Sequence, residues 1–420
     1  MKIALLNQPL GNRGDESAHK AFIRTLIQKF PQAKIDVIFL NQKNELIEAM
    51  KVVNKNIRYV NIRGLKVSVR AEQFGLVFHC ISIISFIHPV LKKFRKLLKE
   101  YDHVICAPGG ICMGGFMNWD HIYQLLLAKS LGKSLIYWGR SIGPFSNEDF
   151  RHALFMKYST QILHYATFIS LRDAKSLQIA SHMGLPVIST VDSAFLEVPS
   201  ATLPDNLIKS LKNTPYVVYV PNSLTWHYRY NNVEQQKIDQ FYYEVFDLIY
   251  SLHPDCKIVM LPQTYSTEIA DFEYFKHLSL TYTTKNKSLC DIIVVDENQS
   301  SDIQQQIISK AELVIGARYH SIVFAINNNR PFVSLSYEHK MSGLLDTLDL
   351  TQYMVEIQNI FDHGNEVLFD KAIESIKEKI KIAKNTPEKT TLAKQISYTA
   401  FEEMCAEIEK HRLSDKSYNK

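Results

Sequence analysis

Two side chains that could bind an anion or transfer a proton lie two residues apart, directly after an apolar run at residues 314–317. Arg318 offers a planar fork of N–H donors for a carboxylate or a phosphate. His320 carries the one side chain whose ordinary pKa lets it give or take a proton near neutrality. Lys340 follows the next apolar run, at residues 331–336. Together these residues predict a site that binds an anionic ligand and moves a proton.

The elements around these residues explain how they could meet. The β-branched residues and the Gly-Ala pair of 314–317 predict a buried strand that ends in a tight turn, and 331–336 predict the next strand. Ligands of α/β proteins bind at the carboxyl ends of parallel strands, so all three side chains are expected at one pocket edge. A helix over 321–327, beginning at Ser321, would direct its first amides at the same anion. The alternative is that a single Arg or His after a strand is a surface or structural group.

Composition limits the class of protein. A chain of 420 residues exceeds the usual size of a single core, so two domains are expected. With 46% hydrophobic and 22% charged residues, the chain is an ordinary globular protein. The net charge of +5 suits a small anionic substrate or a membrane surface. Because no basic patch with interleaved aromatic residues is present, we expect no nucleic-acid partner.

The cysteines indicate a reducing compartment. Six are present, and they form no CxxC pair and no Cys/His ligand spacing. We therefore expect reduced, mostly buried thiols and a cytoplasmic location. The apolar run at residues 1–6 is too short for a signal peptide and predicts a strand.

One stretch raises the question of a membrane. Residues 74–91 are nearly uncharged, and a cluster of lysines and one arginine follows them. The stretch barely reaches the length of a spanning helix and contains His79, His88 and Pro89, which disfavours a span. Two interpretations of residues 74–99 remain equal alternatives. The segment contacts anionic lipid at the membrane surface, or it is a core helix with a solvated basic face.

Strands alternate with helices along the whole chain, which predicts parallel sheets. A proline-punctuated polar stretch at 199–215 is the expected linker. The predicted fold is α/β, with two Rossmann-like domains that face a central cleft. Its parts are an N-terminal domain at 1–198, a C-terminal domain at 216–369 and a helical segment at 370–420.

Glycine turns follow several of the predicted strands. After the first strand, Asn12 lies between two glycines, where the backbone can approach a ligand or simply make a tight turn. The spacing does not match GxGxxG. A helix over 17–30 is expected next, with Asp15 or Ser17 as its cap. Gly110 ends a Pro-Gly-Gly turn that predicts a wall of the cleft. Residues 134–138 predict another strand, with Gly139 as the turn and Arg140 at the strand end.

Taken together, these motifs resemble the polysaccharide pyruvyl transferase family, enzymes that move a pyruvyl group from phosphoenolpyruvate onto a sugar of a cell-surface glycan. The motifs that carry the resemblance are Gly11-Asn12-Arg13-Gly14-Asp15-Glu16, Pro108-Gly109-Gly110, Trp138-Gly139-Arg140-Ser141-Ile142-Gly143-Pro144, Ser170-Leu171-Arg172-Asp173, Val191-Asp192-Ser193-Ala194-Phe195 and Gly316-Ala317-Arg318-Tyr319-His320-Ser321 with Lys340.

The resemblance implies a GT-B-like fold, no metal, and no cofactor besides phosphoenolpyruvate as the donor. It implies that Arg318, His320 and Lys340 bind phosphoenolpyruvate in the C-terminal domain. Arg172 and Arg140 would face the cleft from the N-terminal domain, on the acceptor side. The chain departs from the family at Ile111-Cys112-Met113, where members commonly carry a polar or acidic residue. For the Gly110 loop, we therefore expect backbone contacts only.

The chemistry of the donor suggests roles for the residues. His320, as an imidazolium, would protonate the methylene carbon of phosphoenolpyruvate, and a sugar hydroxyl would attack the resulting cationic centre. Attack by a second hydroxyl after phosphate leaves would give a cyclic ketal. Three aspartates are candidate bases, although each is equally suited to capping or structure: Asp15, Asp173 and Asp192.

Two other functions stay open. A GT-B glycosyltransferase would bind a nucleotide sugar and needs an acidic residue for the ribose, for which Glu338 is the close candidate. A non-catalytic glycan- or phosphate-binding relative would keep the fold without turnover.

If the chain is a pyruvyl transferase, we expect its acceptor to be a nucleotide- or lipid-linked sugar of a capsule or exopolysaccharide. The location is cytoplasmic, with peripheral contact at the inner face of the membrane as an alternative.

Overall fold

The computed structural model describes residues 1–64, 81–114, 117–212, 214–227, 229–265, 270–285, 291–362 and 366–418. Within these residues the chain folds into two compact units, each built on a parallel β-sheet. The first unit comprises Met1–Leu10, Ala18–Glu197 and Gln395–Lys420, and the second comprises Gly11–Ser17 and Val198–Lys394. The predicted α/β class with two Rossmann-like domains is confirmed.

The first unit contains an eight-stranded sheet in the order β3-β2-β1-β4-β6-β7-β8, with β5 paired to β6. Its strands are β1 (Lys2–Leu6), β2 (Lys34–Leu40), β3 (Ile57–Ile62), β4 (His103–Cys106), β5 (Gly109–Gly114), β6 (Ser134–Gly143), β7 (Phe168–Leu171) and β8 (Ile188–Ser189). Its helices are α1 (Arg13–Lys29), α2 (Asn44–Met50), α4 (Ile81–Ile87), α5 (Pro89–Leu98), α6 (Trp119–Ser130), α7 (Phe150–Tyr165), α8 (Ala174–His182) and the 3-10 turn η1 (Ser193–Leu196).

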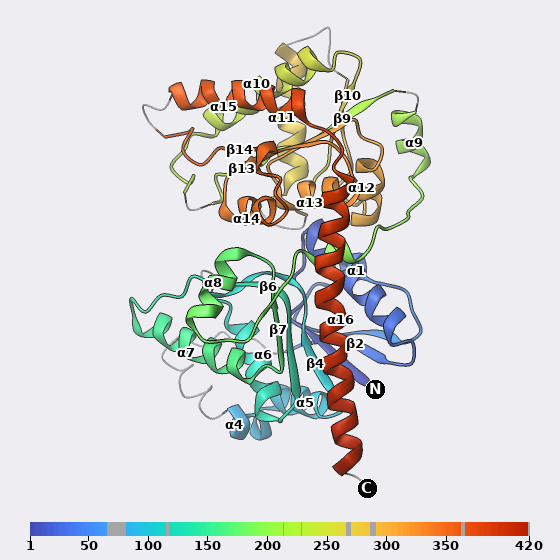
Figure 1. Ribbon diagram of the computed structural model, residues 1–420, viewed down its shortest axis with the longest axis vertical. Helices are drawn as coiled ribbons and strands as arrows, with labels where there is room; N and C mark the ends of the chain where they lie inside the picture. Colours follow the sequence, from blue (N-terminus) through green and yellow to red (C-terminus); the bar gives the residue numbers. More distant parts are fainter. Residues whose placement is uncertain are drawn as a thin grey trace. The chain divides into compact units, whose positions relative to one another are not determined.

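Alternation along β1 shows how this sheet is covered on both faces. Ile3 and Leu5 join the core that contains residues of α1, α2 and α16 (Pro387–Tyr418). Ala4 and Leu6 point to the opposite face and join the core that contains residues of α5, α6 and α7. Figure 1 shows these helices on the two sides of the sheet. Successive side chains of a strand face opposite ways, so a fully apolar strand requires such a double cover.

The second unit contains a six-stranded sheet in the order β11-β10-β9-β12-β13-β14. Its strands are β9 (Tyr216–Val220), β10 (Lys257–Met260), β11 (Ile292–Val294), β12 (Leu313–Gly316), β13 (Phe332–Ser336) and β14 (Met354–Glu356). Its helices are α9 (Asp205–Leu211), α10 (Gln235–Leu252), α11 (Asp271–Lys285), α12 (Ser301–Ile308), α13 (Tyr319–Asn327), α14 (His339–Thr347), the 3-10 turn η2 (Thr351–Tyr353) and α15 (Glu366–Ile382). The figures show helices on both sides of this sheet as well.

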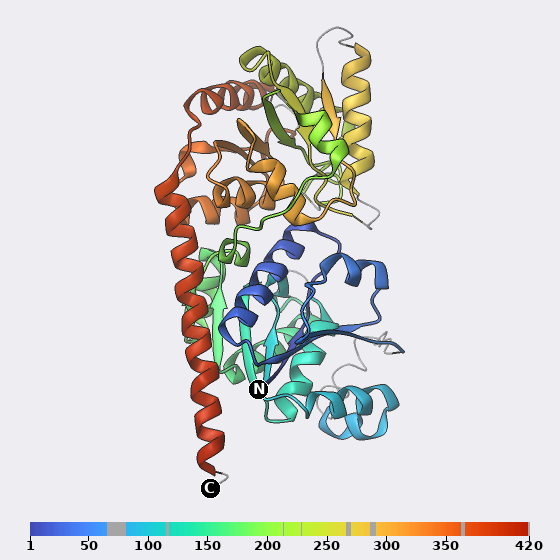
Figure 2. The same ribbon diagram turned by 90° about the vertical axis from the view of Figure 1, so that its right-hand side faces the viewer.

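Two segments fall into different units from those that the sequence suggests. Gly11–Ser17 lie within the range predicted for the N-terminal domain but cluster with the second unit. The last helix, α16, begins among residues of the second unit, and its later part packs on the first sheet through Phe401 and Met404. Figure 2 shows α16 as a single long helix.

Two element boundaries also differ from the prediction. The first helix begins at Arg13 rather than at residue 17, because the Asn12 side chain caps it by accepting from the Gly14 amide at 2.7 Å. Strand β6 does not end at Trp138 but continues to Gly143, so Arg140 lies inside a strand.

The predicted membrane stretch is described only in part. Residues 74–80 lie outside the described residues, while α4 and α5 cover most of the remainder. No helix among the described residues is long and apolar enough to cross a membrane. Of the cysteines, Cys106 and Cys405 are buried free thiols, and Cys112 and Cys256 are partly exposed free thiols. Cys80 and Cys290 lie outside the described residues.

Candidate active site

Arg318 lies at the carboxyl end of β12 and precedes the first turn of α13. Its guanidinium is buried and donates to the Asp271 carboxylate and, at 3.4 Å, to the Thr264 hydroxyl. Burial disfavours the charge, but Asp271, together with Tyr337 and Tyr242, outweighs that effect and raises the pKa of Arg318 above its ordinary value. The arrangement holds a permanent positive charge at the end of the strand.

Asp271 is itself anchored to the loop that follows β10. Its second carboxylate oxygen accepts from the amides of Gln263 and Thr264, both at 2.9 Å. A carboxylate that accepts two amides and a guanidinium has little freedom to move. Asp271 therefore fixes the orientation of Arg318 relative to the ends of β10 and β12.

Three buried N–H donors around Arg318 have no partner among the described residues. They are Nε of Arg318, Nε2 of Gln263 and Nδ2 of Asn222. These residues follow β12, β10 and β9, which are neighbours in the sheet. An unsatisfied buried donor costs about 1–3 kcal/mol, so three at neighbouring strand ends indicate a place where a ligand supplies acceptors.

An aromatic side chain connects this set of donors. Trp226 donates through Nε1 to the Asn222 side-chain oxygen at 2.9 Å, and its ring lies 5.8 Å from the Arg318 guanidinium carbon. The Asn222 amide group is therefore oriented with its oxygen toward Trp226. Its NH2 group is left to donate elsewhere.

The glycine loop of residues 11–17 is bound to the second unit. The Arg13 amide donates to the Gln263 carbonyl at 2.8 Å, and the Tyr265 amide donates to the Gly11 carbonyl at 2.9 Å. The Arg13 guanidinium lies 3.8 Å from the centre of the Tyr265 ring and donates to Glu16 at 2.5 Å. These contacts place the loop at the same strand end as Gln263.

Glu16 makes a further connection from this loop. It is fully buried and accepts from the Ser301 amide and hydroxyl at 3.0 and 3.1 Å, at the start of α12. A carboxylate at a helix N-terminus is favoured by the exposed amides there. Burial and the negative charge of Glu16 raise the pKa of Tyr265 to about 12.

His320 lies in the first turn of α13 and is 6% exposed. Its ring faces the loop at Gly14, where an added Cβ would lie 1.8 Å from Nδ1. The structure therefore brings together three residues that the sequence analysis singled out: Arg318, His320 and the glycine loop at Asn12. Asn12 uses its side-chain oxygen to cap α1, which leaves its NH2 group for other contacts.

The other two predicted residues of the second unit take different positions. Lys340 lies in the first turn of α14, after β13, with Nζ 3.6 Å from Glu338 and the side chain 23% exposed. It is thus a partly accessible cation that follows β13, the strand next to β12. Ser321 is fully buried, and its hydroxyl donates to the Arg318 carbonyl at 2.5 Å. Ser321 stabilises the turn and does not present its hydroxyl to a ligand.

In the first unit, Arg140 is fully buried inside β6. It donates to the backbone carbonyls of Ala107 at 2.6 Å, Gly110 at 3.3 Å and Asn7, and to the Cys112 sulfur at 3.1 Å. The prediction that Arg140 binds substrate requires an accessible guanidinium, which this position does not offer. Arg140 instead connects the chain segments that follow β1 and β4, and the Gly110 carbonyl is one of its acceptors.

Arg172 also pairs with a buried carboxylate. Its guanidinium pairs with Asp192, with side chains 6% and 0% exposed. Asp192 also accepts from the Ala194 amide at 3.0 Å, and Asp173 accepts from the Ser176 amide at 2.8 Å. Of the three candidate bases, Asp15 alone is neither fully buried nor bound to a helix cap in this way.

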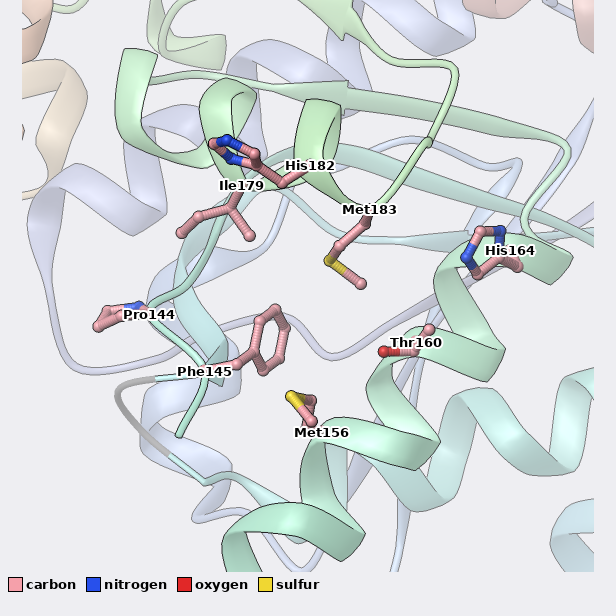
Figure 3. Close-up of a pocket in the computed structure, with 8 residues that line it drawn as sticks. All are labelled: Pro144, Phe145, Met156, Thr160, His164, Ile179, His182 and Met183. Atoms are coloured by element: carbon pink, nitrogen blue, oxygen red, sulfur yellow. The ribbon is translucent and has the colours of Figure 1, made fainter. Parts of the chain in front are cut away.

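A separate cavity of about 390 Å³ lies between α7, α8 and the chain after β6 (Figure 3). Apolar side chains of Phe145, Met156 and Met183 point into it, and His164 and His182 lie toward its rim. None of the predicted site residues lines this cavity. A Cβ at Gly143 would lie 2.3 Å from the Ile179 side chain, so this motif glycine permits packing beside the cavity.

The sequence analysis missed Asn222, Gln263, Trp226 and Asp271. A signal existed for the two amides, because Pro-Asn-Ser and Pro-Gln-Thr follow two neighbouring strands in the same way. No comparable pattern marks Asp271, which begins a helix in a polar stretch.

Comparison with solved structures supports the fold. The chain is similar to the UDP-GlcNAc 2-epimerase of Neisseria meningitidis, with a TM-score of 0.58, 11% identity, and coverage of 98% of this chain and 100% of that chain. It is also similar to UGT89C1 of Arabidopsis thaliana, with a TM-score of 0.54, 10% identity, and coverage of 97% and 99%. These likenesses agree with the predicted GT-B-like fold.

Comparison of sequences supports the family. The chain is 26% identical over 393 residues to the amylovoran biosynthesis protein AmsJ of Erwinia amylovora, which covers 86% of this chain and 89% of that protein. A sequence profile of polysaccharide pyruvyl transferases matches residues 12–339, a range that includes the glycine loop, Arg318 and His320. The chain belongs to the polysaccharide pyruvyl transferase family.

Proposed function

We propose that this chain transfers the pyruvyl group of phosphoenolpyruvate to a pair of sugar hydroxyls, forming a ketal during exopolysaccharide synthesis in the cytoplasm. The observation that carries the proposal is the set of buried donors on Arg318, Gln263 and Asn222, held beside His320. The similarity to an amylovoran biosynthesis protein supports an exopolysaccharide as the product.

Phosphoenolpyruvate has the acceptor groups that these buried N–H donors require. Phosphoenolpyruvate carries a carboxylate and a phosphate, and each can accept several hydrogen bonds from fixed N–H groups. Arg318 supplies the permanent charge, and the Asn222 and Gln263 amides supply neutral donors. Lys340, in the first turn of the helix after the neighbouring strand β13, supplies a second cation that can reach the phosphate as a point charge.

The reaction follows from proton transfer to carbon. The His320 imidazolium gives its proton to the methylene carbon of the donor, which becomes a methyl group and leaves a cationic centre at the adjacent carbon. A sugar hydroxyl attacks that carbon, and the carbon–oxygen bond to phosphate then breaks. A second hydroxyl closes the ketal. Of the two hydroxyl protons, one restores His320 and the other leaves with phosphate.

Phosphate release tests this assignment. Purified protein is incubated with phosphoenolpyruvate and a panel of nucleotide-linked and lipid-linked sugars, and inorganic phosphate is measured. General acid catalysis contributes about 10²–10⁴-fold, so His320→Gln is expected to lose phosphate release by that factor while retaining donor binding. Normal turnover in this variant removes His320 from the mechanism. Release of a nucleoside diphosphate from a nucleotide sugar, measured separately and without phosphoenolpyruvate, indicates glycosyl transfer instead.

A further inference from the structure

The helix α4 presents three large apolar side chains to solvent. Ile83, Phe86 and Ile87 are 60%, 56% and 76% exposed. Their spacing of three and four residues places them on one face of the helix. The opposite face of α4 is buried through Ile81 and Ser85, so packing within the unit does not explain this exposed apolar surface.

The neighbouring helix α5 has the opposite chemistry on its outer side. It buries Leu91, Phe94 and Leu98 in the core of the first unit. Its exposed side carries Lys92, Lys93 and Lys96, and the exposed Lys99 follows at its C-cap. The figures show α4 and α5 side by side at one end of the first unit. An apolar surface therefore lies next to a strongly basic one.

One contact joins the two surfaces. The Arg95 guanidinium carbon of α5 lies 3.7 Å from the centre of the Phe86 ring of α4. A cation over an aromatic ring is attracted by the negative face of the ring. This pair holds a positive charge against Phe86, one of the exposed apolar side chains of α4.

We propose that α4 and α5 form a docking surface for an anionic phospholipid bilayer. In this arrangement Ile83, Phe86 and Ile87 enter the boundary between headgroups and acyl chains, and the lysines of α5 lie among the lipid phosphates. Lysine is depleted in the centres of protein–protein interfaces, whereas apolar residues flanked by lysines are typical of membrane surfaces. The proposal does not depend on the transfer chemistry, because none of these residues belongs to the candidate active site.

Vesicle flotation of the full-length protein tests the proposal. We expect the protein to float with vesicles made of equal parts phosphatidylcholine and phosphatidylglycerol, and to remain with the soluble fraction when the vesicles are phosphatidylcholine alone. Raised salt is expected to weaken the binding, because it screens exposed charges. Each lysine near an anionic surface contributes about fivefold in binding, so replacing all four with glutamine is expected to lower binding by about six-hundredfold.

Matched variants separate the apolar and basic contributions. The apolar variant carries Ile83→Gln, Phe86→Gln and Ile87→Gln, and it is expected to abolish flotation. Its control changes three equally exposed apolar residues elsewhere: Phe150→Gln, Leu280→Gln and Val367→Gln. The control for the lysines changes four exposed lysines on other elements: Lys175→Gln, Lys209→Gln, Lys371→Gln and Lys384→Gln. Both controls are expected to bind vesicles like the unmodified protein.

Three results would overturn the proposal. The first is that the unmodified protein does not float with anionic vesicles. The second is that the control variants lose binding as strongly as the α4 and α5 variants, which would indicate a general charge effect. The third is that light scattering, without lipid, detects a dimer that the α4 variant alone abolishes, which would make this surface an interface between two copies. Melting curves of all variants establish that each is folded.

Discussion

The backbone of Gly14 lies directly against the imidazole of His320. A Cβ on Gly14 would lie 1.8 Å from Nδ1 and 1.9 Å from Cγ of that ring, distances that no real side chain tolerates. Both residues belong to the second unit, although one lies near the start of the chain. The glycine loop therefore fixes one face of the side chain that we propose as the proton donor.

Gly14→Ala is expected to lose phosphate release by about a hundredfold or more, because the added methyl group displaces the proposed general acid. Donor binding, measured by calorimetry, is expected to persist, since Arg318 is unchanged. The comparison variant Gly110→Ala adds a Cβ that meets no atom within 4 Å and is expected to leave the melting temperature unchanged. Full turnover in Gly14→Ala would show that catalysis does not require the His320 ring to lie against residue 14.

Asp271→Asn is expected to destabilise the protein by about 3–5 kcal/mol, because it leaves the buried Arg318 charge without its partner. An anionic donor would again neutralise the charge of Arg318. The rise in melting temperature caused by phosphoenolpyruvate is therefore expected to be larger in this variant than in the unmodified protein.

The matched control is Asp192→Asn, which breaks another buried pair, with Arg172 in the first unit. A similar loss of stability is expected, with no gain in the response to phosphoenolpyruvate. If both variants respond alike to the donor, the Arg318–Asp271 pair has no special relation to the donor site.

Arg140→Met is expected to lower the free energy of unfolding by about 3 kcal/mol, because the buried Ala107 carbonyl and the partly buried carbonyls of Asn7 and Gly110 lose their donor. Denaturant unfolding measures this change. The account predicts that the KM values of any folded fraction change little. Unchanged stability together with a raised KM would instead assign Arg140 to substrate binding.

Local patterns in the sequence predicted the alternation of strands and helices, although not every element: β3, β5 and β14 were not predicted. The apolar run before Arg318 predicted β12. The positions of Arg318 and His320 after a strand followed from that pattern, because the carboxyl ends of parallel strands share one edge.

Partners that are distant in the sequence could not be predicted. The Arg13 amide meets Gln263, and Arg318 meets Asp271, through folding of the whole second unit. Gly139 was interpreted as a turn after Trp138, whereas β6 continues through it and buries Arg140. A glycine inside a strand and a glycine at its end look alike in one sequence.

The pH dependence of stability offers a test in the first unit. His19 is buried and contacts the Gln8 side chain at 2.7 Å and the Tyr59 hydroxyl at 3.1 Å. Burial, with the nearby charges of Lys20 and Arg24, lowers the pKa of His19 from 6.5 to about 3. Between these values the unfolded chain binds the proton and the folded chain does not. Stability is therefore complete above pH 6.5 and is lost as the pH falls.

The slope from this one residue is about 1.4 kcal/mol per pH unit between pH 6.5 and 5. His19→Gln is expected to reduce the observed slope by that amount, measured by denaturant unfolding at several pH values. A slope identical to that of the unmodified protein would mean that His19 is not buried in its neutral form.

The most direct test of the central claim is a thermal-shift titration with phosphoenolpyruvate and, separately, with UDP-N-acetylglucosamine. It is made on the unmodified protein and on Arg318→Lys, which keeps the charge beside Asp271 but lacks the planar fork. A ligand at a hundred times its Kd stabilises the folded state by about 2.7 kcal/mol. The account predicts such stabilisation by phosphoenolpyruvate, and its loss in the variant. Stabilisation by the nucleotide sugar alone would contradict the account.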